Sequence, residues 1–245
     1  MASSVVAKAR MASLVFMALM LFVSRSEPAD AGGGDVATDS VPADTAEHVR
    51  ALVSENPGER RSASETYCRE QMNPARAEYF PCILNRFRLT EDARGFVARI
   101  PTDPGDLASL WQVDAIVQRG VASPTQIPKP MGAATFLAAF LQAMNGIARS
   151  GKPEALDRLL VIQRGADGWM AEEVEQSNLD LLASEPSLLV DHWDVVTKHE
   201  KELGFGTTDF EARRKTIEQK YKAYCAETPR PADACERALR FLAQN

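Results

Sequence analysis

The sequence is poor in the residues and motifs from which enzymes build catalytic centres. Its 245 residues include only three histidines and four cysteines. No nucleophile elbow, phosphate-binding loop or dinucleotide-binding fingerprint occurs along it. No two cysteines have the close spacing, with a histidine beside them, that zinc ligands have. The sequence therefore supports no particular enzymatic reaction, and it predicts neither a cofactor nor a metal site.

Charge and hydropathy restrict the partners. The chain carries a formal net charge of −6, whereas proteins that bind nucleic acid present a basic surface to the phosphates. We therefore expect neither nucleic acid nor an anionic membrane as the partner. Residues 131–148 are the most apolar stretch beyond the N-terminus, but Gln142 and Asn145 interrupt it. We expect this stretch to form a buried helix and not a transmembrane segment.

The first 31 residues predict where the protein goes. Lys8 and Arg10 precede ten apolar residues, Leu14 to Val23, and Ala29 and Ala31 offer the small residues of a cleavage site. Ten apolar residues are too few to span a bilayer, which needs about 20 in a helix. We interpret residues 1–31 as a signal peptide, with an uncleaved anchor or a buried helix as alternatives. We expect an exported protein, either periplasmic or extracellular, with residues 32–43 as a flexible leader.

The four cysteines predict disulfide bonds. In an oxidising compartment, an even number of cysteines at short spacings indicates a disulfide framework. Three pairings of Cys68, Cys82, Cys225 and Cys235 exist, and the short spacings favour Cys68 with Cys82 and Cys225 with Cys235. The second bond would join two helices across a turn.

Apolar periodicity and capping residues predict a mostly α-helical fold over residues 44–245, which we interpret as a single domain. Asp44 with Glu47, and Ser62 with Glu65, have the spacing of capping boxes at the start of two helices. Further helices are expected from Asp103 onward, with starts near residues 131, 153, 169, 186, 208 and 231. The starts at 153, 169 and 186 are 16 to 17 residues apart. The helices would form an antiparallel bundle or a short array similar to helical repeats.

Residues 79–100 leave two interpretations open. Residues 87–89 and 96–100 have the composition of two short strands around a turn, which would make a small β-hairpin near 87–100. A helix through Cys82 to Phe87, followed by a loop, fits equally well. Periodicity does not distinguish strand from helix in runs this short.

His192 and His199 are the residues that most resemble a pair of metal ligands. Seven residues place them on the same face of one predicted helix, but about 10.5 Å apart along its axis. A single zinc ion lies about 2 Å from each of its ligand nitrogens. Because both histidines share the helix face with Leu188 and Val195, we expect partly buried packing residues and no metal site.

The distribution of charge suggests a binding surface. Residues 154–194 contain ten acidic and two basic residues. A segregated acidic surface attracts a basic partner, although a solvated helix face has the same composition. We therefore expect an exported, non-enzymatic helical protein, an interaction or scaffold module, that binds another exported or envelope protein. Glu172, Glu173 and Glu175 are the predicted binding residues.

A local motif offers an enzymatic alternative. Residues 165–170, Gly-Ala-Asp-Gly-Trp-Met, and residues 175–178, Glu-Gln-Ser-Asn, resemble the two motifs of lytic transglycosylases. The resemblance implies a periplasmic enzyme that cleaves cell-wall glycan with Glu175 as the general acid. Such an acid needs a raised pKa. The order of the two motifs is reversed here, and Ala171 stands in the place of the family's glutamine.

A third alternative is a carrier of a small ligand. Phe136, Phe140 and Met144 recur along the apolar segment 131–150. They could line a pocket beside that helix, although the usual place of such side chains is the core.

Overall fold

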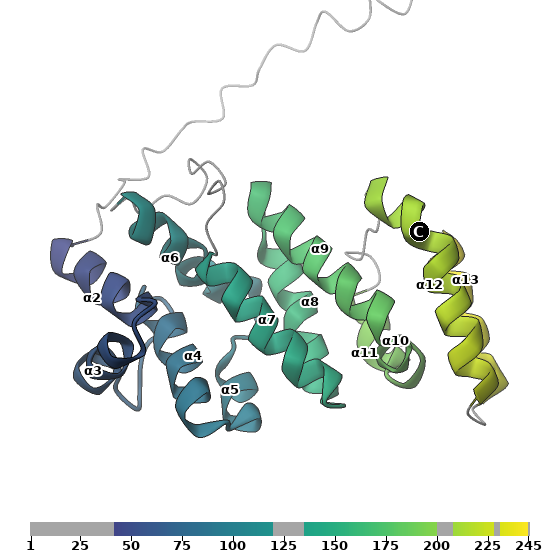
Figure 1. Ribbon diagram of the computed structural model, residues 1–245, viewed down its shortest axis with the longest axis horizontal. Helices are drawn as coiled ribbons and strands as arrows, with labels where there is room; N and C mark the ends of the chain where they lie inside the picture. Colours follow the sequence, from purple (N-terminus) through teal and green to yellow (C-terminus); the bar gives the residue numbers. More distant parts are fainter. Residues whose placement is uncertain (1–41, 120–134, 200–207, 228–230, 245) are drawn as a thin grey trace, which may run out of the picture. The chain divides into compact units, whose positions relative to one another are not determined.

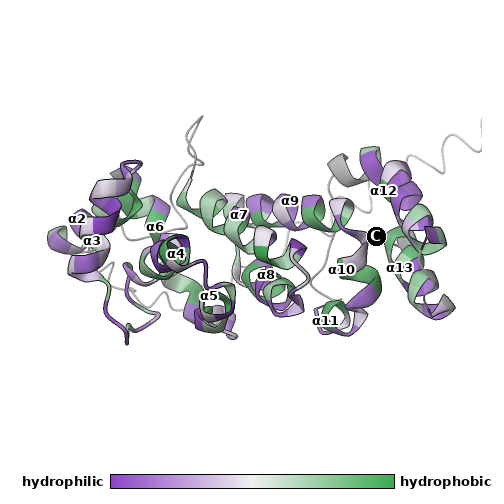
Figure 2. Ribbon diagram, turned by 60° about the horizontal axis from the view of Figure 1, so that its bottom comes forward, coloured by the Kyte–Doolittle hydropathy of each residue, from purple (hydrophilic) through white to green (hydrophobic). Residues whose placement is uncertain are grey.

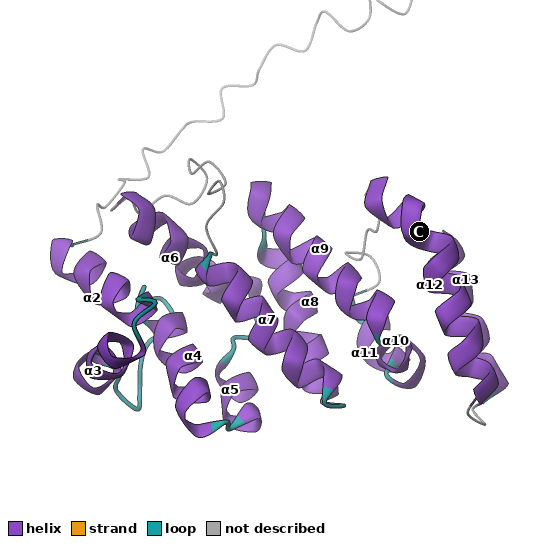
Figure 3. Ribbon diagram, viewed as in Figure 1, coloured by secondary structure: helices purple, strands orange, loops and turns teal. Residues whose placement is uncertain are grey.

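The computed structural model describes residues 42–119, 135–199, 208–227 and 231–244. These residues belong to one compact unit, Asp39–Asn245. They form twelve α-helices and one 3-10 helix, and no strand occurs among them (Figure 3). The prediction of a mostly α-helical bundle is therefore confirmed. The predicted signal peptide, almost all of the predicted leader, and the proline-rich connector at 123–130 lie outside the described residues.

No helix in the described ranges is both long and apolar enough to cross a membrane. Figure 2 shows that apolar and polar residues alternate around most helices. This is the pattern of helices that bury one face against their neighbours.

The first two helices, α2 (Ala43–Val53) and α3 (Pro57–Tyr67), show that both predicted capping boxes were wrong. Helix α2 has Pro42 at its N-cap position and no side-chain cap. Helix α3 begins at Pro57 because the Asn56 side chain accepts hydrogen bonds from the backbone N–H groups of residues 58 and 59. A proline in the first helical position after an asparagine cap is a strong start signal. Ser62 therefore lies inside the helix.

Of the two interpretations left open for residues 79–100, the helix through Cys82 to Phe87 is the one that forms, and the β-hairpin near 87–100 does not. Residues 79–99 form α4 (Tyr79–Thr90) and α5 (Ala93–Arg99), and the Asp92 side chain caps α5 at the N–H of Gly95. The rings of Phe87 and Phe96 stack with their centroids 4.8 Å apart. The apolar residues that suggested two strands are thus the facing sides of two short helices.

The middle of the chain follows the prediction closely. Asp103 caps the 3-10 helix η1 (Pro104–Leu107), which leads into α6 (Ala108–Arg119). Helices α7 (Phe136–Arg149), α8 (Pro153–Gly165) and α9 (Gly168–Ser184) come next, and α7 packs against both α8 and α9 (Figure 1). Helix α7 is central, since its Phe140 and Met144 are fully buried.

The helix predicted to start near residue 186 and to carry both His192 and His199 is interrupted. It consists of α10 (Pro186–Asp191) and α11 (Trp193–Thr197), separated at His192. His199 follows α11, is 5 % exposed, and has its Nε2 atom 3.1 Å from Oδ1 of Asp157. Because of this break, the two histidines do not share one helix face.

Two disulfide bonds fasten the described chain. Cys68, at the end of α3, is bonded to Cys82 on α4. Cys225 on α12 (Thr208–Glu227) is bonded to Cys235 on α13 (Ala232–Gln244), which lies beside it (Figure 1). The two local pairings predicted from the spacing are those that the structure contains.

Candidate functional site

The three glutamates predicted to bind a partner lie on α9. Glu172 is exposed, while Glu173 and Glu175 are partly buried. Burial and the negative charge of Glu172 raise the pKa of Glu175 above its ordinary value. A raised pKa is the property that the glycan-cleaving alternative needs. However, Glu175 lines none of the three cavities described below.

The glycines of the transglycosylase-like motif have structural explanations. A Cβ atom on Gly165 would lie 3.2 Å from Cβ of Pro104, so glycine allows α8 to pack closely on η1. Gly168 has a φ of 52°, a left-handed conformation that glycine adopts without strain, at the start of α9. The backbone accounts for both glycines without a substrate.

Two of the three side chains named for the alternative carrier pocket lie in the core. Phe140 and Met144 pack in the core with no exposure. Phe136 instead lines a cavity of about 500 Å³ between α2, α3, α4, α6 and α7.

That cavity is one of three that adjoin along α3 and α4. A small cavity of about 180 Å³ shares Arg60 and Arg88 with it. The small cavity in turn shares Ser64 and Leu89 with a cavity of about 560 Å³ beside the Cys68–Cys82 bond. We call these the lower (500 Å³), central (180 Å³) and upper (560 Å³) cavities, and together the arginine surface.

The arginine surface has an excess of positive charge in an acidic protein. Four acidic residues line it: Glu55, Glu65, Glu70 and Asp114. Seven arginines line it: Arg50, Arg60, Arg61, Arg69, Arg86, Arg88 and Arg99. Within the described part of the chain, only Arg61 among these seven has a carboxylate partner, Glu65 at 3.3 Å. Arginines elsewhere, such as Arg158 and Arg237, are paired with a neighbouring aspartate.

Exposed apolar side chains also concentrate here. Leu89, 59 % exposed, and Val117, 36 % exposed, are the large hydrophobic side chains most open to solvent among the described residues. Leu89 lines the upper and central cavities, and Val117 lines the lower one. Single exposed apolar residues are common, but their position on the same surface as the unpaired arginines is characteristic of a binding site.

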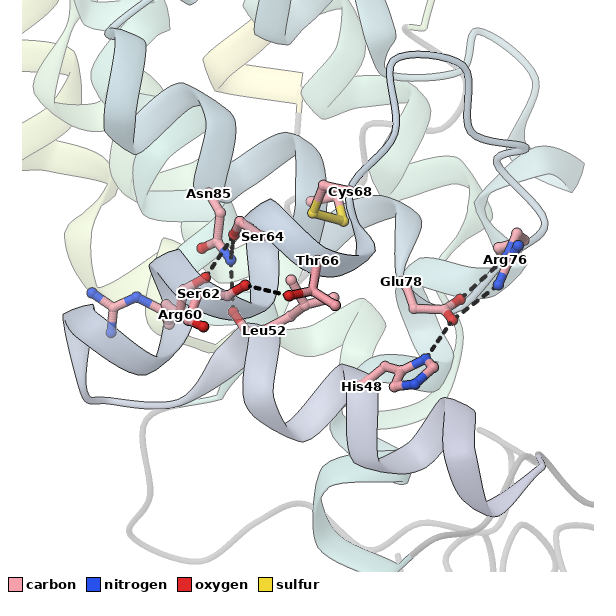
Figure 4. The surroundings of a disulfide bond; sticks show 11 residues. His48, Leu52, Arg60, Ser62, Ser64, Thr66, Cys68, Arg76, Glu78 and Asn85 are labelled. Atoms are coloured by element: carbon pink, nitrogen blue, oxygen red, sulfur yellow. Dashed lines mark hydrogen bonds and ion pairs between the residues drawn. A yellow bond between two sulfur atoms is a disulfide. The ribbon is translucent and has the colours of Figure 1, made fainter.

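A buried polar network holds the helices that carry this surface. The side-chain amide of Asn85 donates hydrogen bonds to the backbone carbonyl of Leu52, at 2.8 Å, and to the hydroxyl of Ser64, at 3.1 Å. Ser64 in turn donates to the carbonyl of Arg60, at 2.7 Å (Figure 4). One asparagine on α4 thereby fixes α2 and α3, so the cavity walls are preorganised.

Arg60 and Arg88 meet at the junction of the lower and central cavities. Arg60 donates from Nη1 to the backbone carbonyl of Ser54, which orients its guanidinium group. Burial and the positive charge of Arg60 lower the pKa of Arg88 below its ordinary value. Arg88 has neither a hydrogen bond nor an ion pair with any residue that the structure describes. Arg88 is itself exposed, so the two like charges lie near each other without a carboxylate partner.

This surface was not predicted from the sequence. Six of its arginines come from four helices and Arg69 comes from the loop after α3, and they have no common period, so no single segment looks basic. The available signal was the mixed composition of residues 86–89, Arg-Phe-Arg-Leu, which places two arginines and an exposed leucine on one short stretch of α4.

Comparison with known proteins adds no functional assignment: no protein-family model, no curated protein and no solved structure matches the chain. Within the ranges that the structure describes, no three histidine, cysteine, aspartate or glutamate side chains come together as a set of metal ligands. The function is therefore inferred from the geometry of the arginine surface.

Proposed function

We propose that this protein is an exported, non-enzymatic binding module, and that its arginine surface takes an acidic segment of a partner protein. The observation that carries the proposal is the coincidence of the unpaired arginines and the most exposed apolar side chains on one row of cavities. Arginine is enriched among the residues that dominate binding energy, because it combines charge with apolar surface.

An extended segment fits the row of cavities better than one compact ligand does. The three cavities share lining residues but have separate volumes, so an occupant with successive side chains could fill each in turn. Carboxylates would pair with the guanidinium groups, and apolar side chains would cover Leu89 and Val117. The partner therefore presents both acidic and apolar residues.

Export rests on two supports. The N-terminal sequence has the charge, apolar run and small residues of a signal peptide. The two disulfide bonds are of the kind that persists in an oxidising compartment. The partner would accordingly be another exported or envelope protein.

Fluorescence anisotropy with a labelled synthetic peptide tests the proposal. The peptide contains glutamate and leucine in mixed order, and the control peptide has lysine in place of glutamate. We expect the acidic peptide to bind, with an affinity that falls as salt rises, and the basic peptide not to bind. Equal binding of the two peptides would contradict the proposal.

Matched variants localise the binding. The double variant Arg60→Gln/Arg88→Gln should lower the affinity for the acidic peptide at least tenfold, because it removes the two positive charges at the centre of the arginine surface. Arg94→Gln is the control, since Arg94 is exposed on α5 and lines none of the three cavities. It should leave the affinity within about twofold, in line with the small effects of surface substitutions.

A glycan-cleaving enzyme is a second candidate, favoured by the raised pKa of Glu175. Incubation with purified peptidoglycan decides it. Turnover that is lost in Glu175→Gln would support the enzyme, whereas no turnover by the unmodified protein would exclude it.

A further inference from the structure

The central cavity differs from its two neighbours in size and in charge. Its volume is about 180 Å³, and three arginines, Arg60, Arg61 and Arg88, line it without any acidic residue. Both larger cavities include carboxylates in their linings. The central cavity is therefore the most cationic part of the arginine surface.

Two positive charges in this cavity have no carboxylate partner, those of Arg60 and Arg88. Glu65 neutralises Arg61, and both side chains of that pair are largely exposed. Arg60 uses one N–H to hold the carbonyl of Ser54, a contact that fixes its position but leaves its charge unbalanced. Arg88 has no counter-ion among the described residues, and burial together with the Arg60 charge lowers its pKa.

The chemistry of the two guanidinium groups selects the ligand. Each presents a planar fork of N–H donors that matches the oxygens of a phosphate or sulfate group. A carboxylate brings one negative charge and would leave one arginine unbalanced. A phosphate ester carries between −1.5 and −2 at neutral pH, with three acceptor oxygens, and so balances both arginines at once.

We infer that the central cavity is a site for a tetrahedral dianion, the phosphate group of a phosphorylated residue, bound between Arg60 and Arg88. This inference rests on the proposed function, because it names the group that the partner's acidic segment presents at the middle of the arginine surface. The larger cavities on either side then take the residues that flank the modified one.

The first test uses inorganic sulfate and the full chain with both disulfides formed. Titration followed by NMR should show saturable shifts of the α3 and α4 amides with sodium sulfate, and none with sodium chloride at equal ionic strength. Arg88→Gln should lower the affinity for sulfate at least tenfold. Arg94→Gln, exposed on α5 and outside all three cavities, should change the sulfate affinity by less than twofold. Equal loss in both variants would overturn the inference.

Folding of the Arg88→Gln variant is itself informative. Removal of one of two like charges should raise the thermal unfolding midpoint in the absence of anion, and sulfate should then stabilise this variant less than the unmodified protein. Sulfate also stabilises proteins by exclusion from their surface, so an equal rise of both midpoints would count against a specific site.

Peptide arms separate this inference from the proposed function. One central glutamate of the acidic peptide is replaced by phosphoserine in one peptide, and by sulfotyrosine, whose sulfate ester carries a single negative charge, in a second peptide. We expect the phosphoserine peptide to bind tenfold tighter than the parent, the sulfotyrosine peptide to show no such gain, and Arg88→Gln to abolish the gain of phosphoserine. If the parent binds and phosphoserine does not improve its affinity, the dianion site is wrong while the binding function stands. If sulfate binds through Arg88 but no peptide binds, the site stands and the proposed function is wrong.

Discussion

The phenolic oxygen of Tyr221 on α12 lies 2.8 Å from the backbone carbonyl of Leu182 on α9, and Tyr221 is completely buried. Burial raises the pKa of this phenol, which stays protonated and donates the hydrogen bond. The contact connects the disulfide-bonded α12–α13 pair to the end of the longest helix of the middle of the chain.

Tyr221→Phe removes this hydrogen bond and leaves the carbonyl of Leu182 without its donor. We expect the free energy of unfolding to fall by about 1–3 kcal/mol, the usual range for a buried polar group that loses its partner. Urea denaturation measures the change. Tyr224→Phe is the matched control, because its hydroxyl donates to the exposed carboxylate of Asp191. A loss of similar size in both variants would contradict the account.

The two disulfides should have separable effects. Replacing Cys225 and Cys235 by serine should lower the free energy of unfolding by about 3 kcal/mol and leave peptide binding intact. Replacing Cys68 and Cys82 should lower stability and also weaken peptide binding, because both cysteines line the upper cavity. The same anisotropy assay measures both variants. Unchanged binding in the second variant would separate that bond from the site.

Asp114 predicts a specific pH dependence. Burial and the nearby Glu173 charge raise its pKa above the ordinary value of 3.8, although the N–H groups of Phe136 and Leu137 oppose the rise. A raised pKa means that the folded state binds this proton more tightly than the unfolded state does. The resulting stabilisation is complete below pH 3.8 and is lost as pH rises through the folded-state pKa.

Asp114→Asn has no such proton to lose. Its free energy of unfolding should therefore increase relative to that of the unmodified protein from about pH 4 to pH 7, because only the unmodified protein loses stability over this range. Denaturation at several pH values checks the sign. A constant difference between the two proteins would show that Asp114 does not titrate in this range.

Glu78 should act in the opposite direction at acid pH. Burial alone would raise its pKa, but its own backbone N–H, Arg76 and His48 together lower it below the ordinary 4.5 (Figure 4). Its contribution is present above pH 4.5 and is lost as pH falls through the lowered pKa. Glu78→Gln should accordingly be destabilised at neutral pH and lose less stability than the unmodified protein on acidification, as followed by circular dichroism.

Removing the charge of Glu172 tests the enzymatic alternative. Its charge is one of the two causes that raise the pKa of Glu175, so Glu172→Gln should lower that pKa. Carboxyl carbon NMR measures the titration of Glu175. An unchanged value would leave burial as the whole cause of the shift.

Features set by neighbouring residues could be predicted from the sequence, whereas features set by contacts between distant segments could not. Pro153, Gly165 and the two close cysteine spacings are local signals, and α8 and both disulfides were predicted correctly. The stacking of Phe87 on Phe96 is a contact between two helices, and without it residues 87–100 resemble strands. At Asn56, the asparagine–proline pair begins α3, a start signal that the prediction from the sequence did not use.

The candidate site depends almost wholly on long-range contacts. Arg60 and Arg88 are 28 positions apart in the chain and meet only because Asn85 fixes α4 against α2 and α3. Counting charges along the sequence favoured the acidic segment around α9, whose role in binding a basic partner stays a prediction. Positive charge gathered from several helices becomes visible only when the helices are packed.

Hydrogen–deuterium exchange with and without the acidic, leucine-containing peptide tests the central claim most directly. The account predicts slower exchange in α3 and α4, residues 57–67 and 79–90, and unchanged exchange in α9, residues 168–184. Protection confined to α9, or no protection anywhere at saturating peptide, would contradict the assignment of the arginine surface as the binding site.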